Sequence, residues 1–288
     1  MAQQIAFQGA PGAYSEEAIL RGFDEADPDP HPAFEDVFGA VASGAVNRGL
    51  VPIENAVFGS VRVNYDHLRT HDVAIVGELS LRIHHHLMAP AGASVDALDT
   101  VRSHAQALGQ CRAWLQAHAP QATTEATPDT AGAAQTVAEA GDPTVGAVAS
   151  GRAAERYGLT VLAKGLEDDP ANFTRFLVLA PEGASSSSAS GTDHKTSVAF
   201  VLQENVPGAL FKSLAVFALR ELDLLKIESR PLVGHPGRYR FYLDVDGAAG
   251  TDALSRALDH LREITSELQV LGSYPYGPTY GRPEDPQP

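Results

Sequence analysis

The sequence has a single cysteine, Cys111, among its 288 residues. One cysteine cannot form an internal disulfide, and a cysteine-rich metal site is excluded for the same reason. Basic residues are also scarce, because 21 lysines and arginines stand against 36 aspartates and glutamates, for a formal net charge of −15. Without a basic cluster, neither nucleic acid nor an anionic membrane surface is expected as a partner.

Long hydrophobic runs are missing as well, since no apolar stretch approaches the roughly 20 residues of a membrane-spanning helix. The first residues, MAQQIAFQGAPGAYSEEA, lack the basic and apolar regions of a secretory signal. We therefore expect a cytoplasmic protein. Its hydrophobic content of 44% is ample for buried cores, and its length allows one large domain or two ordinary ones.

One composition break divides the chain. Residues 181–194, PEGASSSSASGTDH, are rich in serine and glycine, which is typical of a flexible linker. The break predicts one domain over residues 1–180 and a second over residues 195–275. Residues 276–288, YGPTYGRPEDPQP, are predicted to form a disordered tail because proline and glycine dominate them.

The two domains show different patterns. Residues 1–180 alternate short apolar runs, such as QIAFQG, RGLVPI and RFLVLA, with helical patterns, which indicates an α/β sheet flanked by helices. Ligands in such sheets bind beyond the carboxyl ends of the strands, so strand-end residues are site candidates. Residues 195–275 predict the order βαββαβ, which is that of a ferredoxin-like unit.

The stretch IAFQGAPGAYSEEA predicts a strand, a glycine turn and a helix. It lacks the spacing of a dinucleotide fingerprint and the lysine of a P-loop, so nucleotide binding is poorly supported. Ser15 would be the helix N-cap, with Glu16 and Glu17 in the first turn. The same helix start could instead present NH groups to a small anion, and both interpretations stay open.

Several polar residues follow apolar runs. Glu54 and Asn55 come directly after GLVPI, where the local pattern alone favours an ordinary polar loop, and their place at the carboxyl end of a strand makes them site candidates. Ser103 and Gln106 have the spacing of a capping box, which predicts a structural role for Ser103. Capping does not explain Gln110, although a solvated glutamine would.

The run ANFTRFLVL opens with Thr174 and Arg175, directly after a loop, where sites are often built. Three consecutive histidines, His84 to His86, occur in RIHHHLMAP. Successive residues of a strand point to opposite faces, so these three cannot ligate one metal together. Packed or solvent-facing histidines are expected there, and neither a metal nor a cofactor is predicted.

These segments in this order resemble the prephenate dehydratase family with a C-terminal ACT domain. The resemblance runs from Ile5 to Pro275 and depends on GAPGAYSEEA, VPIEN, SHAQALGQC, AAERYGL and NFTRFLVL, followed by PGAL and IESRP. It implies conversion of prephenate to phenylpyruvate, water and carbon dioxide, a step of phenylalanine biosynthesis. It also implies two α/β subdomains of the type II periplasmic-binding-protein kind, spanning about 1–77 plus 160–180 and 78–159.

The resemblance also implies site residues by motif position. The catalytic candidates are Asn55, Ser103, Gln110 and Thr174. The substrate-binding candidates are Glu54, Arg175, Phe176 and Ser15. The sequence departs from the family pattern at Ala13, Ala56 and Ala105, where a hydroxyl residue or a proline is common, and none of the three is a residue assigned to chemistry.

The ACT resemblance implies phenylalanine as an allosteric effector, bound where two copies pair in a homodimer or homotetramer. The segments that match the phenylalanine-binding motifs contain Pro207, Gly208, Ala209, Leu210, Glu228, Ser229, Arg230 and Pro231. Two alternatives remain. Arogenate dehydratase acts on the amino analogue of prephenate, and a non-catalytic amino-acid sensor would use the same domains for binding alone.

Overall fold

A computed structural model of the chain describes residues 2–184 and 193–281. Residues 185–192 of the predicted linker and residues 282–288 of the predicted tail lie outside the described residues. The chain groups into two compact units, Met1–His71 with Leu79–Leu177 and Pro278–Pro288, and Asp72–Glu78 with Val178–Gly277. The division between the units falls within two strands, whereas the sequence places it at the linker. No helix among the described residues is long and apolar enough to cross a membrane.

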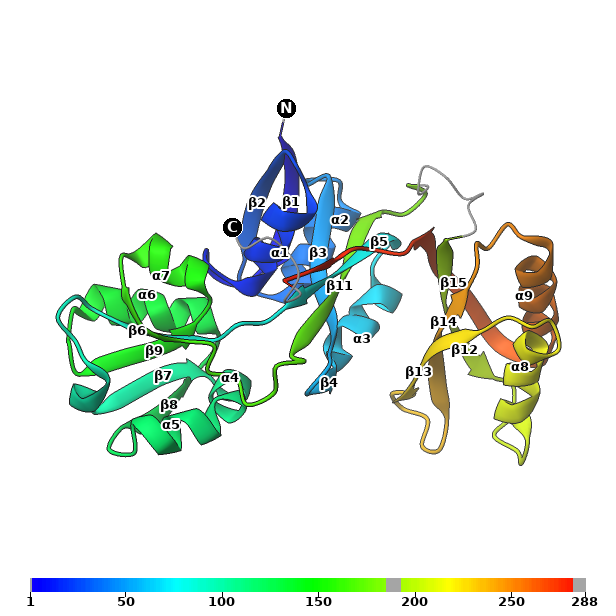
Figure 1. The fold of residues 1–288 in the computed structure, drawn as a ribbon. Helices are drawn as coiled ribbons and strands as arrows, with labels where there is room; N and C mark the ends of the chain where they lie inside the picture. Colours follow the sequence, from blue (N-terminus) through cyan, green and yellow to red (C-terminus); the bar gives the residue numbers. More distant parts are fainter. Residues whose placement is uncertain (1, 185–192, 282–288) are drawn as a thin grey trace. The chain divides into compact units, whose positions relative to one another are not determined.

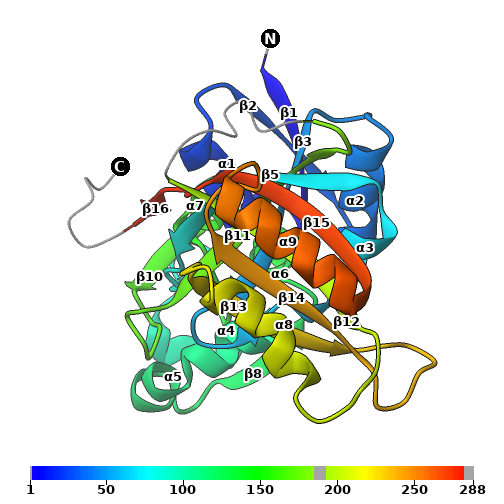
Figure 2. The same cartoon turned by 90° about the vertical axis from the view of Figure 1, so that its right-hand side faces the viewer.

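The first sheet has the strand order β16-β5-β11-β3-β1-β2, with β4 paired to β3. Figure 1 labels all of these strands except β16, which is labelled in Figure 2. Its strands are β1 (Gln3–Gln8), β2 (Ala26–His31), β3 (Arg48–Asn55), β4 (Gly59–Ser60), β5 (Val73–Arg82), β11 (Phe173–Pro181) and β16 (Thr279–Tyr280). Helices α1 (Tyr14–Gly22), α2 (Phe34–Ala42) and α3 (Arg62–Thr70) follow β1, β2 and β4 along the chain. The sequence ADPDPH does not predict the strand β2, yet its prolines are tolerated because β2 lies at the sheet edge.

The last strand of this sheet, β16, lies within the tail that the sequence predicts to be disordered. Thr279 and Tyr280 form β16, which pairs in parallel with Ser80 and Leu81 of β5. The Ser80 backbone NH also donates to the Pro278 carbonyl at 2.9 Å. The prediction of disorder from residue 276 onward is therefore wrong for the residues up to 281, because backbone pairing orders a segment that its composition leaves undetermined.

The second sheet has the order β10-β6-β9-β7-β8. Its strands are β6 (His86–Ala89), β7 (Thr100–His104), β8 (Thr123–Thr127), β9 (Val145–Ala149) and β10 (Thr160–Lys164). One core packs α4 (Ala105–Gln110) and α5 (Arg112–His118) on this sheet, and another packs α6 (Thr130–Ala140) and α7 (Gly151–Tyr157). The sequence assigns residues 160–164 to the first subdomain, but β10 pairs antiparallel with β6 of the second sheet.

Two chain segments connect these sheets. Residues 83–85 lead from β5 to β6, and residues 165–172 lead from β10 to β11. The two segments are hydrogen bonded to each other, because the Ile83 NH donates to the Asn172 carbonyl at 2.7 Å and the Leu166 NH to the His85 carbonyl at 2.9 Å. Residues that lie here touch both α/β halves of the first unit.

The second unit contains the predicted βαββαβ order. Its elements are β12 (His194–Leu202), α8 (Ala209–Ala218), β13 (Leu224–Pro231), β14 (Tyr239–Asp246), α9 (Asp252–Ile264) and β15 (Thr265–Pro275). The sheet order is β13-β14-β12-β15, and both helices cover the same face (Figure 2). Phe200, Phe217, Leu243 and Leu258 fill the core between them, as the apolar periodicity predicts. The predicted fold class is confirmed.

Candidate functional site

Thr174 and Asn55 lie next to each other, although 119 positions separate them. Thr174 is the second residue of β11 and is 9% exposed. Its Oγ1 accepts a hydrogen bond from Nδ2 of Asn55, the last residue of β3, at 3.0 Å. Two candidates predicted separately from their motifs thus meet at the ends of two strands of one sheet.

The Asn55 side chain has a fixed orientation. Its Oδ1 accepts from the backbone NH groups of Val57 and Phe58, both at 3.0 Å. An amide oxygen must face these two donors, so the Nδ2 group faces Thr174 and Asn172, to which it donates at 3.0 and 2.9 Å. Because the Thr174 oxygen accepts from Asn55, the hydroxyl hydrogen of Thr174 points elsewhere.

Asn172 is a site residue that the sequence does not single out. It is 1% exposed, and its Oδ1 accepts from both Asn55 Nδ2 and Gln110 Nε2, the latter at 3.2 Å. The Nδ2 of Asn172 is buried and has no hydrogen-bond partner in the described part of the chain. The only signal for it in the sequence is its place in the loop before ANFTRFLVL, two residues ahead of Thr174.

Gln110 is the last residue of α4 and extends this network to the second sheet. Its Oε1 lies 2.5 Å from Nε2 of His85, and Nδ1 of His85 lies 2.7 Å from the Tyr14 hydroxyl. The result is a six-residue hydrogen-bond chain that joins Tyr14, His85, Gln110, Asn172, Asn55 and Thr174. The sequence predicts three of its members, and misses Tyr14, His85 and Asn172.

Ser103 lies apart from that chain. It is fully buried on β7, and its Oγ donates to the Val148 carbonyl of β9 at 2.5 Å. The predicted capping box is wrong, because α4 begins after His104, whose Nδ1 accepts from the Gln106 NH at 3.3 Å. Strand pairing extends one residue beyond Ser103 and so displaces the helix start.

Ser15 is not an N-cap either. Helix α1 starts at Tyr14 with Ala13 as its cap residue, and Ser15 is buried within the first turn. The Gly12 NH donates to Glu16 Oε2 at 2.6 Å, and Arg152 Nε donates to the same oxygen at 2.9 Å. The Glu16 carboxylate therefore already accepts the hydrogen bond of a turn NH group that an external anion could otherwise have used.

The remaining predicted residues frame the site. Glu54 pairs with Ser60 in the β3–β4 ladder and is half-buried, as is Arg175 on β11. Phe176 is buried. Burial alternates at Thr174, Arg175 and Phe176, so Arg175 faces away from Thr174, as strand geometry requires.

The three histidines have three different environments. Residues 83–85 lie between strands, so the strand expected for the whole motif is wrong, and only His86 belongs to β6. Glu167 accepts from the His84 ring at 2.9 Å and from the His85 backbone NH at 2.9 Å. Burial raises the pKa of Glu167, but these hydrogen bonds outweigh it and the pKa is lowered. Within the described residues, no three His, Cys, Asp or Glu side chains gather as metal ligands.

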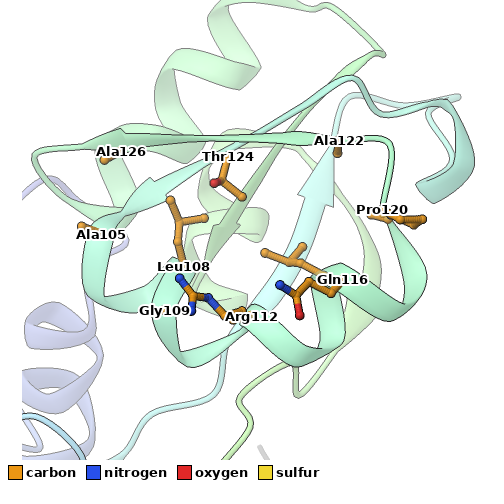
Figure 3. A pocket seen from close by; sticks show the side chains of 11 residues that line it. Ala105, Leu108, Gly109, Arg112, Gln116, Pro120, Ala122, Thr124 and Ala126 are labelled. Carbon is orange, nitrogen blue, oxygen red and sulfur yellow. The ribbon is translucent and has the colours of Figure 1, made fainter.

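A groove of about 650 Å³ opens on the second sheet, away from these residues. It lies between α4, α5 and the edge strand β8, with Arg112 and Gln116 on the helical side and Thr124 on the strand side (Figure 3). None of the predicted catalytic residues lines it. Gln110 is on the same short helix but is buried toward the connecting segments.

The predicted effector residues lie at one end of the third sheet. Gly208, with φ of +83°, precedes α8, and Glu228 to Pro231 end β13. Arg230 is paired with Arg240, and Arg240 with Val201, so the end of β13 lies at the same sheet end as the end of β12, the strand that precedes Gly208.

A family model, a curated relative and a solved structure that are similar to this chain all have prephenate dehydratase in their descriptions. Residues 5–184 match the family model described as prephenate dehydratase. Arogenate dehydratase/prephenate dehydratase 2, chloroplastic, of Arabidopsis thaliana is 43% identical over 287 residues, which cover 96% of this chain and 74% of that protein. The structure of prephenate dehydratase in complex with L-Phe from Arthrobacter aurescens aligns with a TM-score of 0.87 at 32% identity, covering 94% of this chain and 90% of that chain.

A second similar structure has a different title. The protein GqqA, described as a novel type of quorum-quenching acylase, aligns with a TM-score of 0.87 at 32% identity, over 95% of this chain and 98% of that chain. The same overall fold is thus associated with two described activities.

Proposed function

This chain belongs to the prephenate dehydratase family, and on that premise we propose that it converts prephenate to phenylpyruvate, water and carbon dioxide. In this reaction the bond from the ring to its hydroxyl oxygen breaks, and so does the bond from the ring to its carboxylate. The electron pair of the carboxylate bond enters the ring, which becomes aromatic. The departing hydroxide takes up a proton and leaves as water.

The difficult step is the departure of hydroxide, which needs a proton or strong hydrogen bonds as its bond breaks. We assign to Thr174 the role of hydrogen-bond donor to the departing hydroxide. The observation that supports this role is the hydrogen bond from Asn55 to the Thr174 oxygen, because an accepting oxygen leaves its own hydrogen to point toward a ligand. Threonine is a weak acid, so the contribution is an oriented hydrogen bond rather than complete proton transfer.

The other predicted residues have supporting roles in this proposal. Asn55 and Gln110 orient Thr174 and the substrate, and buried Ser103 joins β7, the strand that precedes α4, to β9. Prephenate carries two carboxylates, and with a net charge of −15 the protein needs a local cation to bind them. Arg175 is the candidate cation, although its strand position directs it away from Thr174 and allows a role in holding the loop instead.

Replacing Thr174 with valine tests the assignment. Thr174→Val keeps the shape of the side chain but removes the hydroxyl, so we expect phenylpyruvate formation to fall more than about tenfold, equivalent to about 1.4 kcal/mol of barrier. Thr174→Ser keeps the hydroxyl and serves as the matched control, with circular dichroism to confirm folding of both. A loss smaller than tenfold in the valine variant would remove Thr174 from the centre of the mechanism.

Two rival activities, arogenate dehydration and acyl transfer, would act on different substrates. Several relatives, including the Arabidopsis protein named above, have arogenate dehydratase in their names, and comparison of kcat/KM for prephenate and arogenate decides between a keto and an amino side chain. An acylase would need an activated nucleophile. The buried Ser103 hydroxyl donates to a backbone carbonyl, so that side chain does not favour acyl transfer.

We also propose feedback regulation by phenylalanine through the second unit. The similar Arthrobacter structure contains L-Phe, and here the start of α8 and the end of β13 lie at one end of the sheet. Pairing with a second copy is supported by β13, an edge strand with exposed Leu225 and Ile227. A homodimer or homotetramer and a cytoplasmic location stay predictions, and the similar Arabidopsis proteins are described as chloroplastic.

A further inference from the structure

His85 lies in the segment that connects the first two sheets, and both of its ring nitrogens are engaged. It is 2% exposed. Its Nε2 lies 2.5 Å from Gln110 Oε1 and its Nδ1 lies 2.7 Å from the Tyr14 hydroxyl, whose ring packs edge-on against the imidazole. Both nitrogens of this buried ring are hydrogen bonded, so the partners on its two sides restrict which nitrogen carries the proton.

The directions of the hydrogen bonds from Asn55 to His85 follow from the orientation of the Asn55 amide. Its two backbone donors fix its amide, so Asn55 Nδ2 donates to Asn172 and the facing atom of Asn172 must be its oxygen. That same oxygen faces Gln110, so Gln110 presents its NH₂ group to Asn172 and its oxygen to His85. His85 must therefore donate from Nε2.

The proton on Nε2 leaves Nδ1 of His85 as an acceptor. The Tyr14 hydroxyl can donate its hydrogen to Nδ1, although the His84 carbonyl oxygen, 2.9 Å from the same hydroxyl, competes for this hydrogen. Burial lowers the pKa of His85 and raises that of Tyr14, which keeps the imidazole neutral and the phenol protonated. One tautomer of one ring therefore satisfies the whole chain.

We infer that His85 is a positioning residue for the dehydration, because its Nε2–H holds the Gln110 amide in the one orientation that keeps Asn172 Oδ1 as the acceptor of Asn55, the residue that donates to Thr174. This inference rests on the proposed function. If the Gln110 amide turned over, its NH₂ group would face the imidazole and its oxygen would face the oxygen of Asn172. Asn172 would then have to turn as well, and Asn55 would lose its acceptor there.

The test compares two replacements of His85 in the full-length protein. His85→Gln places an amide nitrogen four bonds from Cα, as far as Nε2 of histidine, whereas His85→Leu fills similar space without a donor. We expect the leucine variant to lower kcat for prephenate by about 10-fold to 100-fold with little change in KM, and the glutamine variant to restore most of that loss. Equal kcat in both variants would overturn the inference.

A second comparison separates positioning from a general structural role. If His85 acts through Gln110, His85→Leu should lower kcat by less than about twofold in a Gln110→Ala background. A loss by the same factor in both backgrounds would contradict the inference. Should the leucine variant fail to fold, Tyr14→Phe replaces it, with an expected threefold to tenfold loss of kcat that also vanishes in the Gln110→Ala background.

The histidine tautomer offers a readout that does not depend on turnover. In the ¹⁵N-labelled protein, the resonance absent from His85→Gln belongs to His85, and we expect it to report a neutral ring protonated at Nε2. A ring protonated at Nδ1 would overturn the inference while leaving the proposed function untouched. If wild type does not consume prephenate, the proposed function fails. If wild type is active, Thr174→Val is inactive and His85→Leu is unimpaired, only the positioning role fails.

Discussion

The turn at Gly12 should be unusually sensitive to the addition of a single methyl group. Gly12 has φ of +93°, and a Cβ built there would lie 2.9 Å from the Ala153 Cα on α7. The turn is also held by hydrogen bonds, since Ser150 Oγ donates to the Gly12 carbonyl and Tyr157 OH to the Pro11 carbonyl, both at 2.6 Å. Glycine is thus required twice, for its backbone angle and for close approach.

The cost of Gly12→Ala follows from these two requirements. A positive φ costs an alanine about 1–2 kcal/mol. Forcing a methyl group against a neighbouring backbone costs about 1–3 kcal/mol more. Gly92→Ala is the matched control, because Gly92 has φ of +88° and nothing within 4 Å of its built Cβ. We therefore expect the Gly12 variant to lose at least about 1 kcal/mol more free energy of unfolding than the Gly92 variant.

Urea unfolding followed by the fluorescence of the single tryptophan, Trp114 on α5, measures this difference. Turnover should fall in the Gly12 variant alone, because Tyr14, two residues further on, contacts His85. Equal losses of stability in the two variants would show that α7 can move away from the added methyl group without a cost in free energy. That result would refute the close-approach argument.

Two further predictions concern acid stability and regulation. Burial lowers the pKa of His86 to about 4, below its unfolded value of about 6.5. The unfolded chain therefore binds a proton first as pH falls from 6.5 toward 4, and stability is lost across that window. After allowance for solvent screening, we expect wild type to lose about 1 kcal/mol more than His86→Gln between pH 7.5 and 5 in urea titrations, and equal losses would contradict this. We expect phenylalanine to inhibit wild type and Arg256→Ala, an exposed control on α9, but not Arg230→Ala, and undiminished inhibition of that variant would contradict the effector site.

Local pattern predicted much of the fold, because strand and helix periodicities depend on neighbours along the chain. The βαββαβ unit and the strands that contain Asn55 and Thr174 follow from such patterns. Both predicted serine caps are wrong for a reason that lies elsewhere in the molecule. At Ser103 pairing with neighbouring strands carries β7 to His104, and near Ser15 the turn is tied to α7.

The members of the site that the sequence misses are those defined by distant partners. His85 is 25 positions from Gln110 and 71 from Tyr14, while Asn172 is 62 positions from Gln110. In the sequence His85 is one of three adjacent histidines, and nothing local separates its buried ring from its neighbours. Asn172 likewise resembles an ordinary loop residue until the two connecting segments are seen to run together.

Strand β16 has a consequence for the order in which the protein can fold during synthesis. The first sheet includes both Gln3–Gln8 and Thr279–Tyr280, so its final strand is added only after nearly all of the described chain has left the ribosome. Until then β5 has an open backbone edge at Ser80 and Leu81. A nascent chain stalled before residue 279 would display that edge, and chaperone binding or aggregation at this stage would be determined by the last strand rather than by the catalytic residues.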